Sequence, residues 1–415
     1  MPVVGGFDCC YMDLEFSTYY TLICAAVVLV LGRFLVTRVA LLNNFNIPEP
    51  VAGGLVAAVF CFALHEVSGY RVTFSAELQN AFMLVFFSSI GLSANFVKLK
   101  EGGRALLIFL LVIVVFIGVQ NSVGIAMAKM LGLDPLVGLI AGSITLIGGH
   151  GTAGAWGAVL ENEHGVKGAI TLGIACATFG LVIGGLVGGP LAKWLIRRNQ
   201  LQAGAKVEGL NPDESVMPNF SSLHATRLIT AEAAVETMAL FAGCLAFAQF
   251  MTELTADASF KLPTFVWALG GGVIIRNALE YVFRFEVFDR AIDVFGNASL
   301  SIYLAIALLS LKLWELSDLA GSLVVILAVQ TVVMLLYVGF VTFRVMGKDY
   351  DAAVLCAGNC GFGMGATPTA VANMQAITNQ YGPSYKAFLI VPMVGAFFID
   401  ILNAVFIQFF INILS

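Results

Sequence analysis

Long apolar segments recur along the whole chain. A helix needs roughly 20 mostly apolar residues to cross the hydrocarbon core of a bilayer. Ten segments are that long or nearly so: 17–37, 50–66, 79–96, 105–128, 168–192, 228–251, 263–281, 294–311, 320–343 and 387–412. Only 11% of the residues are charged, which is about half the share of an average soluble protein. The sequence therefore predicts an all-α polytopic membrane protein with about ten transmembrane helices.

Two further apolar stretches, 135–160 and 350–380, are interrupted by glycines and polar residues. The first contains GSITLIGGHGTAGAW and the second contains CAGNCGFGMGATPTAVANM. Unpaired backbone groups in hydrocarbon cost several kcal/mol, so a broken helix is tolerated only where protein buries it or where it lines a watery cavity. We therefore expect each stretch to form a re-entrant hairpin with a glycine-rich tip. Pro368 suits the first turn of a half-helix that begins near Ala366 or Thr367.

Basic residues are distributed unevenly between the two sides of this topology. If both hairpins return to the side from which they enter, sixteen Lys and Arg residues lie on one side and five on the other. Because basic loops stay in the cytoplasm, this bias predicts that both termini are periplasmic and that the linker 197–225 is cytoplasmic.

Similar residues recur at a constant offset of 215 positions. The matches include Pro48 with Pro263, Gly132 with Gly347, Asp134 with Asp349, Gly148 with Gly363, Thr152 with Thr367, Ala155 with Ala370 and Gly180 with Gly395. We interpret the offset as an internal duplication in which each half holds five crossings and one hairpin. An odd number of crossings inverts the second half, and inverted repeats are typical of secondary transporters.

The predicted organisation follows from this duplication. Residues 1–16 form a periplasmic N-terminal segment, residues 17–196 form the first repeat with hairpin 135–160, and residues 226–415 form the second repeat with hairpin 350–380. In a broken helix, free N–H groups at the start of one half-helix attract anions, and free C=O groups at the end of another attract cations. The two tips therefore predict a site for an anion accompanied by a small hard cation. For Gly180, Gly184 and Gly188, four residues apart, we predict close helix packing instead.

A few polar residues lie deep inside the apolar segments. Asp400 stands well inside the last crossing, with Asn403 almost one turn later, and a buried carboxylate requires a partner such as a substrate ammonium or a sodium ion. Gln120, Asn121 and Glu236 are further candidates. Arg276 falls near the cytoplasmic end of its crossing, so we do not place it in the site.

The segments FNIPEPVAGG at 45–54, GLDPLVGLIAGSITLIGGHGTAG at 132–154 and 347–400 also resemble a known family. From about residue 17 to the C-terminus, the chain is similar to the bacterial sodium/glutamate symporters. The resemblance implies sodium-driven uptake of glutamate across the inner membrane by a homodimer surrounded by membrane lipid. It also implies an elevator-like movement of a hairpin-carrying core against a scaffold.

Site residues follow from this resemblance together with the hairpin chemistry. The expected substrate-binding residues are Gly148, Gly149, His150, Gly151, Thr152, Gly363, Gly365, Ala366, Thr367, Thr369 and Asp400. The expected sodium ligands are Ser143, Thr145, Asn359, Asn373 and Asn403, together with hairpin carbonyls. The half-helix N-termini receive the two substrate carboxylates, and Asp400 balances the ammonium. We expect no cofactor apart from sodium as the coupling ion, and no nucleic-acid partner.

Three other functions remain open at this point. A sodium-coupled carrier of another small carboxylate, such as citrate, would have the same hairpins but no need for Asp400. A channel is less favoured because a through-pore does not need two sealed hairpins. An intramembrane aspartyl enzyme needs two facing aspartates, and only Asp400 is clearly at depth, so we do not expect an enzyme.

Overall fold

The computed structural model describes residues 3–8, 11–40, 42, 47–68, 70–94, 103–202, 229–255, 262–285, 287–310 and 320–414. Helices occupy all ten positions at which the sequence predicts crossings. In the first half these are α1 (Thr18–Arg38), α3 (Glu49–Ser68), α4 (Ala76–Ser93), α6 (Gly103–Met130) and α9 (Ala169–Arg198). In the second half, the first three crossings correspond to α10 (Ala231–Leu254), α11 (Thr264–Tyr281) and α12 (Asp289–Leu309). The fourth is built from α13 (Ala320–Tyr337), η3 (Val338–Thr342) and α14 (Phe343–Val345), and the fifth from α17 (Tyr385–Met393), η4 (Val394–Phe398) and α18 (Ile399–Leu414). Within the described residues, seven helices are long and apolar enough to span a bilayer, so the chain is a multi-pass membrane protein.

Both interrupted stretches fold as a helix, a turn and a second helix. The first consists of α7 (Pro135–Leu139), the π-helical segment η1 (Ile140–Ile144) and α8 (Gly149–Glu163), and the second consists of α15 (Tyr350–Gly363) and α16 (Thr367–Tyr381). The starts of α7 and α15 are 215 positions apart, as are the starts of α3 and α11. The offset found in the sequence therefore also separates the beginnings of corresponding helices.

The repeated glycine and aspartate before each hairpin have a clear local role. Gly132 and Gly347 both adopt positive φ angles, +72° and +120°, which a side chain would disfavour. Two residues later, the Asp134 carboxylate accepts a hydrogen bond from the backbone N–H of Leu136 at 2.8 Å, and Asp349 accepts one from Ala352 at 2.7 Å. Each pair thus makes a tight turn and then caps the helix that leads into the hairpin.

A small β-sheet corrects the all-α expectation at the N-terminus. Strand β1 (Val3–Asp8) pairs antiparallel with β2 (Tyr11–Glu15), and β2 pairs parallel with β3 (Tyr70–Thr73), which connects α3 to α4. These strands are short, and the third lies far along the chain, so the N-terminal segment gives little periodic signal by itself. Within the described residues, the N-terminal strand β2 is therefore hydrogen-bonded to β3 of the first repeat. Cys9 and Cys10 lie outside the described residues.

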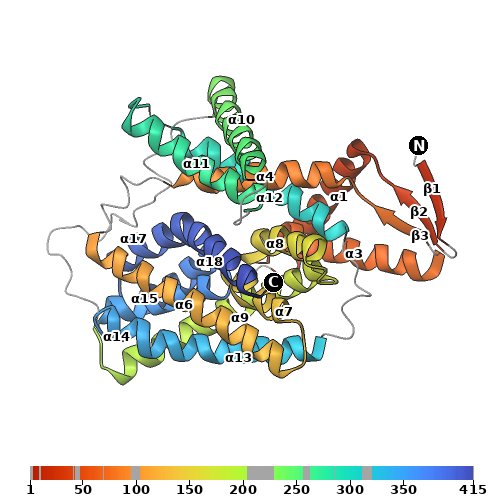
Figure 1. Ribbon diagram of the computed structural model, residues 1–415. Coiled ribbons are helices and arrows are strands. Elements are labelled where there is room, and N and C mark those ends of the chain that lie inside the picture. The colour runs from red at the N-terminus through yellow and green to blue at the C-terminus, as the bar shows by residue number, and fades with distance from the viewer. Residues whose placement is uncertain are drawn as a thin grey trace.

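The helices fall into two groups (Figure 1). In the first group, α1, α3 and α4 pack with α10, α11 and α12, in the upper and right-hand part of the view. In the second group, α6 to α9 pack with α13 to α18 in the lower part. Each group thus combines equivalent helices from the two halves of the chain, and both hairpins belong to the second group.

The glycines spaced along α9 bring this helix against the second hairpin. A Cβ atom on Gly180 would lie 2.2 Å from the carbonyl oxygen of Met364, and one on Gly188 would lie 2.8 Å from that of Ala357. Between them, Gly184 approaches the Cys360 carbonyl oxygen in the same way, at 3.2 Å. The prediction that this glycine run serves close helix packing is confirmed.

Candidate functional site

The tips of the two hairpins meet inside the second helix group. Gly149, which begins α8, has a φ of +63°, and a Cβ atom added to it would lie 3.5 Å from the carbonyl oxygen of Gly365. In the second hairpin Ala366 is extended, and α16 begins at Thr367 with Pro368 in its first turn. The predicted role of Pro368 is confirmed, and segments about 215 positions apart come into contact.

Glycines serve the two tips differently from what the sequence suggests. In the first hairpin only Gly149 has a positive φ, whereas Gly148 is helical and Gly151 lies within α8, facing Phe86. Among the described residues of the second tip, no glycine has a positive φ angle. A Cβ atom on Gly361 would instead lie 2.3 Å from Cα of Ala370 in the opposite arm. We expected Gly361, Gly363 and Gly365 to supply the turn at this tip; the structure places the turn at 364–365, and Gly361 lies within α15, where it permits close contact between the two arms.

Both inner half-helices begin at the tips without a capping side chain. Gly148 precedes α8 and Ala366 precedes α16, and neither offers a side-chain acceptor. The outer half-helices, by contrast, are capped by Asp134 and Asp349. The first N–H groups of a helix have no partner within that helix, and together with the helix dipole they attract negative charge. Two uncapped helix N-termini at one place can receive an anion with two negatively charged groups.

A second break in the first hairpin lies at Gly142. This residue has non-helical angles, φ −106° and ψ −136°, within η1. The N–H group of Ser143 donates to Oδ1 of Asn121 on α6 at 2.9 Å. The carbonyl oxygen of Ser143 accepts a hydrogen bond from Nδ2 of Asn403 on α18 at 3.0 Å. All three side chains are buried, so two asparagines from neighbouring helices satisfy the backbone that the break leaves free.

The second hairpin is held by the adjacent residue on α6. Nε2 of Gln120 donates to the carbonyl oxygen of Gly363 at 3.1 Å, and the backbone oxygen of Gln120 accepts from Nε2 of Gln330 at 2.8 Å. Deeper in the same hairpin, Nδ2 of Asn359 donates to the hydroxyl of Thr342 in η3 at 2.9 Å. Two adjacent side chains, Gln120 and Asn121, thus contact one hairpin each.

Several oxygen atoms in this network have no hydrogen-bond partner. Among the buried side chains of the described part of the chain, they include Oε1 of Gln120, Oγ of Ser143, Oδ1 of Asn359, Oγ1 of Thr369 and Oδ1 of Asn403. Buried polar atoms in folded proteins are nearly always paired. Neutral oxygens without partners are the kind of ligand that a hard cation prefers, so these atoms are candidate cation ligands.

Three other predicted residues use their polar atoms for local packing. Nε2 of His150 donates a hydrogen bond to the hydroxyl oxygen of Thr178, 3.0 Å away. The Thr178 hydroxyl in turn donates its hydrogen to the carbonyl oxygen of Ile174. The Thr145 hydroxyl donates to the carbonyl oxygen of Ile140 at 2.7 Å. Asn373 donates from Nδ2 to the carbonyl oxygen of Gly184 at 2.8 Å, which ties α16 to α9.

Asp400 lies on α18 between contacts to both hairpins. Five residues before it, a Cβ atom on Gly395 would lie 2.7 Å from Oγ1 of Thr367. Three residues after it, Asn403 bonds Ser143. Within the described residues, no hydrogen bond or ion pair of the half-buried Asp400 carboxylate is found.

The remaining charged candidates lie in the first helix group. Glu236 is exposed on α10. Arg276 is only 2% exposed and forms ion pairs with Glu280, at 2.6 Å, and with Asp289. It also donates to the carbonyl oxygen of Leu92 on α4 at 3.2 Å. Arg276 therefore joins α11, α12 and α4, in agreement with its exclusion from the predicted site.

Sequence reasoning missed several uncharged residues of the network. Gln330 lies in the apolar run LVVILAVQTVVML, and Tyr303 in SIYLAIALL. Tyr303 is fully buried and donates a hydrogen bond to the backbone of Gly151. A polar side chain in the middle of an apolar run is the signal that could have identified Gln330, although it does not reveal the partner.

Comparison with known proteins agrees with the sequence resemblance. The family model for the sodium/glutamate symporter matches residues 14–383. The chain is 50% identical over 401 residues to a sodium/glutamate symporter of Haemophilus influenzae, covering 96% of this chain and 98% of the relative. It is 51% identical over 395 residues to that of Escherichia coli and to that of Shigella flexneri, covering 95% of this chain and 97% of each relative. The chain therefore belongs to the sodium/glutamate symporter family, which is a family of transporters.

Proposed function

We propose that this protein couples the downhill entry of sodium to the uptake of glutamate across the bacterial inner membrane. The observation that carries the proposal is the meeting of two uncapped helix N-termini at Gly149 and Gly365, next to buried oxygens without partners. Positive helix ends suit an anionic substrate, and neutral oxygens suit a cation. The names of the relatives support glutamate and sodium as the two solutes.

Glutamate is held by groups from both hairpins and from α18. One carboxylate takes the N–H groups at the start of α8, from Gly149 to Thr152, and the other takes those of Thr367 and Thr369 at the start of α16, since Pro368 has no N–H group. Gly148, Gly363 and Ala366 leave room for close approach at the tips. The ammonium group pairs with Asp400, whose carboxylate has no partner among the described residues. This pairing favours an amino acid over a carboxylate without an amine.

Sodium is held by side-chain and backbone oxygens next to the break at Gly142. Ser143 and Asn403 are already joined by a hydrogen bond, and each has an unpaired buried oxygen. Asn359 contributes a further unpaired oxygen from the second hairpin. We keep Thr145 and Asn373 as weaker candidate ligands, because both already donate hydrogen bonds to backbone carbonyl oxygens. Their oxygens are still able to face a cation.

The transport movement follows from the two helix groups. We infer ten crossings with both termini periplasmic, two inverted repeats, and hairpins that enter the membrane from opposite sides. The constant offset of 215 residues between corresponding helix starts supports the duplication. The second group carries both hairpins and moves against the first as an elevator, which alternates access to the tips.

The first helix group forms the interface of a homodimer in this proposal. Among the candidate spans, α1 and α10 bury the smallest share of their residues within the chain, 22% each. Their exposed surfaces are available to lipid and to a second copy. A fixed dimer of the first group provides the support against which the second group moves.

Uptake of labelled glutamate into proteoliposomes tests the proposed function directly. We expect accumulation only with an inward sodium gradient, and no accumulation when choline replaces sodium. Citrate in large excess should not compete. Uptake that is independent of sodium, or competition by citrate at the same concentrations as glutamate, would overturn the proposal.

A further inference from the structure

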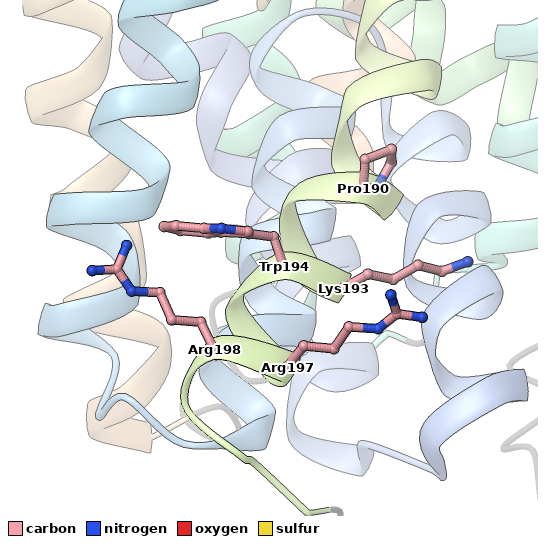
Figure 2. A pocket seen from close by; sticks show the side chains of 5 residues that line it. All are labelled: Pro190, Lys193, Trp194, Arg197 and Arg198. Carbon is pink, nitrogen blue, oxygen red and sulfur yellow. The ribbon is translucent and has the colours of Figure 1, made fainter.

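A basic groove lies at the C-terminal end of α9. Pro190, Lys193, Trp194, Arg197 and Arg198 line it, and its volume is about 480 Å³. Figure 2 shows Lys193 and Arg197 extending to the same side of the helix, one turn apart, with Trp194 and Arg198 on the other side. The groove belongs to the second helix group but lies outside the hairpin site.

Within the described residues, no carboxylate balances the positive charge in this groove. Three of the five lining residues are cationic and none is acidic. Within the described part of the chain, Lys193, Arg197 and Arg198 form no ion pair with a carboxylate. The Arg198 guanidinium instead stacks over the indole ring of Trp194, 4.9 Å from its centre. The groove therefore has the charge of an anion-binding site.

Aromatic partners place the groove at the boundary of the membrane. Arg38 stacks over Phe34 at the end of α1, and Arg344 stacks over Phe340 at the end of α14. In all three pairs the arginine follows the aromatic residue by four positions at a helix C-terminus, and all three arginines lie on the predicted cytoplasmic side. Tryptophan is enriched at the level of lipid headgroups, and α9 is a candidate span that ends at Arg198. The groove thus opens where headgroups lie.

We propose that this groove binds the headgroup of an anionic phospholipid from the cytoplasmic leaflet. Lys193 and Arg197 contact the phosphate, which a guanidinium can bind through two parallel hydrogen bonds. Trp194 packs against the upper part of the acyl chains, since its indole is 47% exposed beside the apolar surface of α9. A basic last turn also offsets the dipole of any helix, but that role requires neither a tryptophan nor a groove.

Lipid binding to the purified full-length protein tests this site without relying on transport. The protein is placed in mixed vesicles of phosphatidylcholine with spin-labelled phosphatidylglycerol, and the motionally restricted lipid is measured. We compare the double variant Lys193→Gln, Arg197→Gln with the wild type. Each cation near the surface contributes about fivefold to the affinity for an anionic lipid, so removing two should weaken the preferred site about twenty-five-fold.

Two controls separate this site from general surface charge. Arg38→Gln removes an exposed arginine that stacks on an aromatic residue in the same manner, and it should leave the preferred site intact. The charge-retaining variant Lys193→Arg, Arg197→Lys should keep most of the preference, which excludes misfolding as the cause of the loss. Equal loss in the Arg38 variant, or no preference for phosphatidylglycerol over phosphatidylcholine in the wild type, would overturn the proposal. Displacement of the lipid by millimolar inorganic phosphate would also overturn it, because the ligand would then be a soluble anion.

Discussion

The hydroxyl of Tyr303 on α12 donates a hydrogen bond to the carbonyl oxygen of Gly151 on α8, 3.3 Å away. This contact joins the first helix group to the hairpin of the second. One turn further along α8, a Cβ atom on Gly154 would lie 2.2 Å from the same hydroxyl. The fully buried Tyr303 can therefore pack between the two helix groups only because residue 154 is glycine and leaves space for its hydroxyl.

Replacing Gly154 with alanine should place a methyl group against the Tyr303 hydroxyl. Removing that hydroxyl in the same protein should relieve the clash. Gly154→Ala places a methyl group against Oη of Tyr303, and overpacking of this kind costs about 1–3 kcal/mol. We expect a large fall in the initial rate of glutamate uptake. The double variant with Tyr303→Phe should regain much of the rate, because the next ring atom is 3.1 Å from the added Cβ. Full activity of Gly154→Ala alone would contradict this packing.

The hairpin tips should not accept a larger side chain. Gly149→Val forces a branched residue into a positive φ, and Gly365→Val brings a Cβ atom within 2.8 Å of the Gly361 carbonyl oxygen. We expect transport to be abolished while membrane insertion is retained. Gly189→Val is the matched control, because nothing lies within 4 Å of a Cβ atom at that position. Normal uptake by either tip variant would count strongly against a binding site at the tips.

Asn403 should determine the affinity for sodium. Asn403→Ala removes an unpaired oxygen and the hydrogen bond to Ser143. A hydrogen bond to a charged group contributes about 1.5–3 kcal/mol, so we expect the sodium concentration for half-maximal uptake to rise at least about tenfold. Gln408→Ala on the same helix is the control, since its amide donates to Asn412 and not to a hairpin. A similar sodium dependence in both variants would remove Asn403 from the site.

Asp400 should distinguish glutamate from the same dicarboxylate without an amine. In the wild type, glutamate should compete for uptake far better than glutarate. Asp400→Asn removes the charge that faces the ammonium, and the loss of one member of a buried charge pair costs about 2–5 kcal/mol. We therefore expect the preference for glutamate over glutarate to fall at least about tenfold. An unchanged preference, with unchanged uptake, would favour a carrier of another carboxylate.

The proposed orientation can be tested with thiol reagents. In a background without the native cysteines, Met130→Cys at the end of α6 should react with a membrane-impermeant maleimide added to spheroplasts. Gln200→Cys, just after α9, should react only after the membrane is opened. Both positions are exposed, so a difference in labelling reports the side of the membrane. Labelling of both from outside would require a different topology.

Features encoded close together in the sequence were predictable, and features that depend on distant partners were not. Gly132 with Asp134 and Gly347 with Asp349 form turns and caps within a few residues, so both pairs could appear as matches at the offset of 215 positions. The start of α16 at Thr367 followed from Pro368.

The break at Gly142 depends instead on Asn121, which lies one helix away. The placement of Gln330 and Tyr303 likewise depends on tertiary contacts. The strand at 70–73 was missed because its partner is at the N-terminus. The sequence suggested candidate ion ligands, but only the packed structure showed which of them already bond backbone groups.

Gln120 and Asn121 fix the distance between the two hairpins from a single point on α6. Because neighbouring residues of one helix each bond one hairpin, at Ser143 and at Gly363, the two hairpins cannot separate without breaking at least one of these bonds. In the transport cycle proposed above, a solute held between the hairpins would therefore move together with the residues that bind it. Its release on either side would then depend on which surroundings the moving group meets there, because the binding geometry itself would not change.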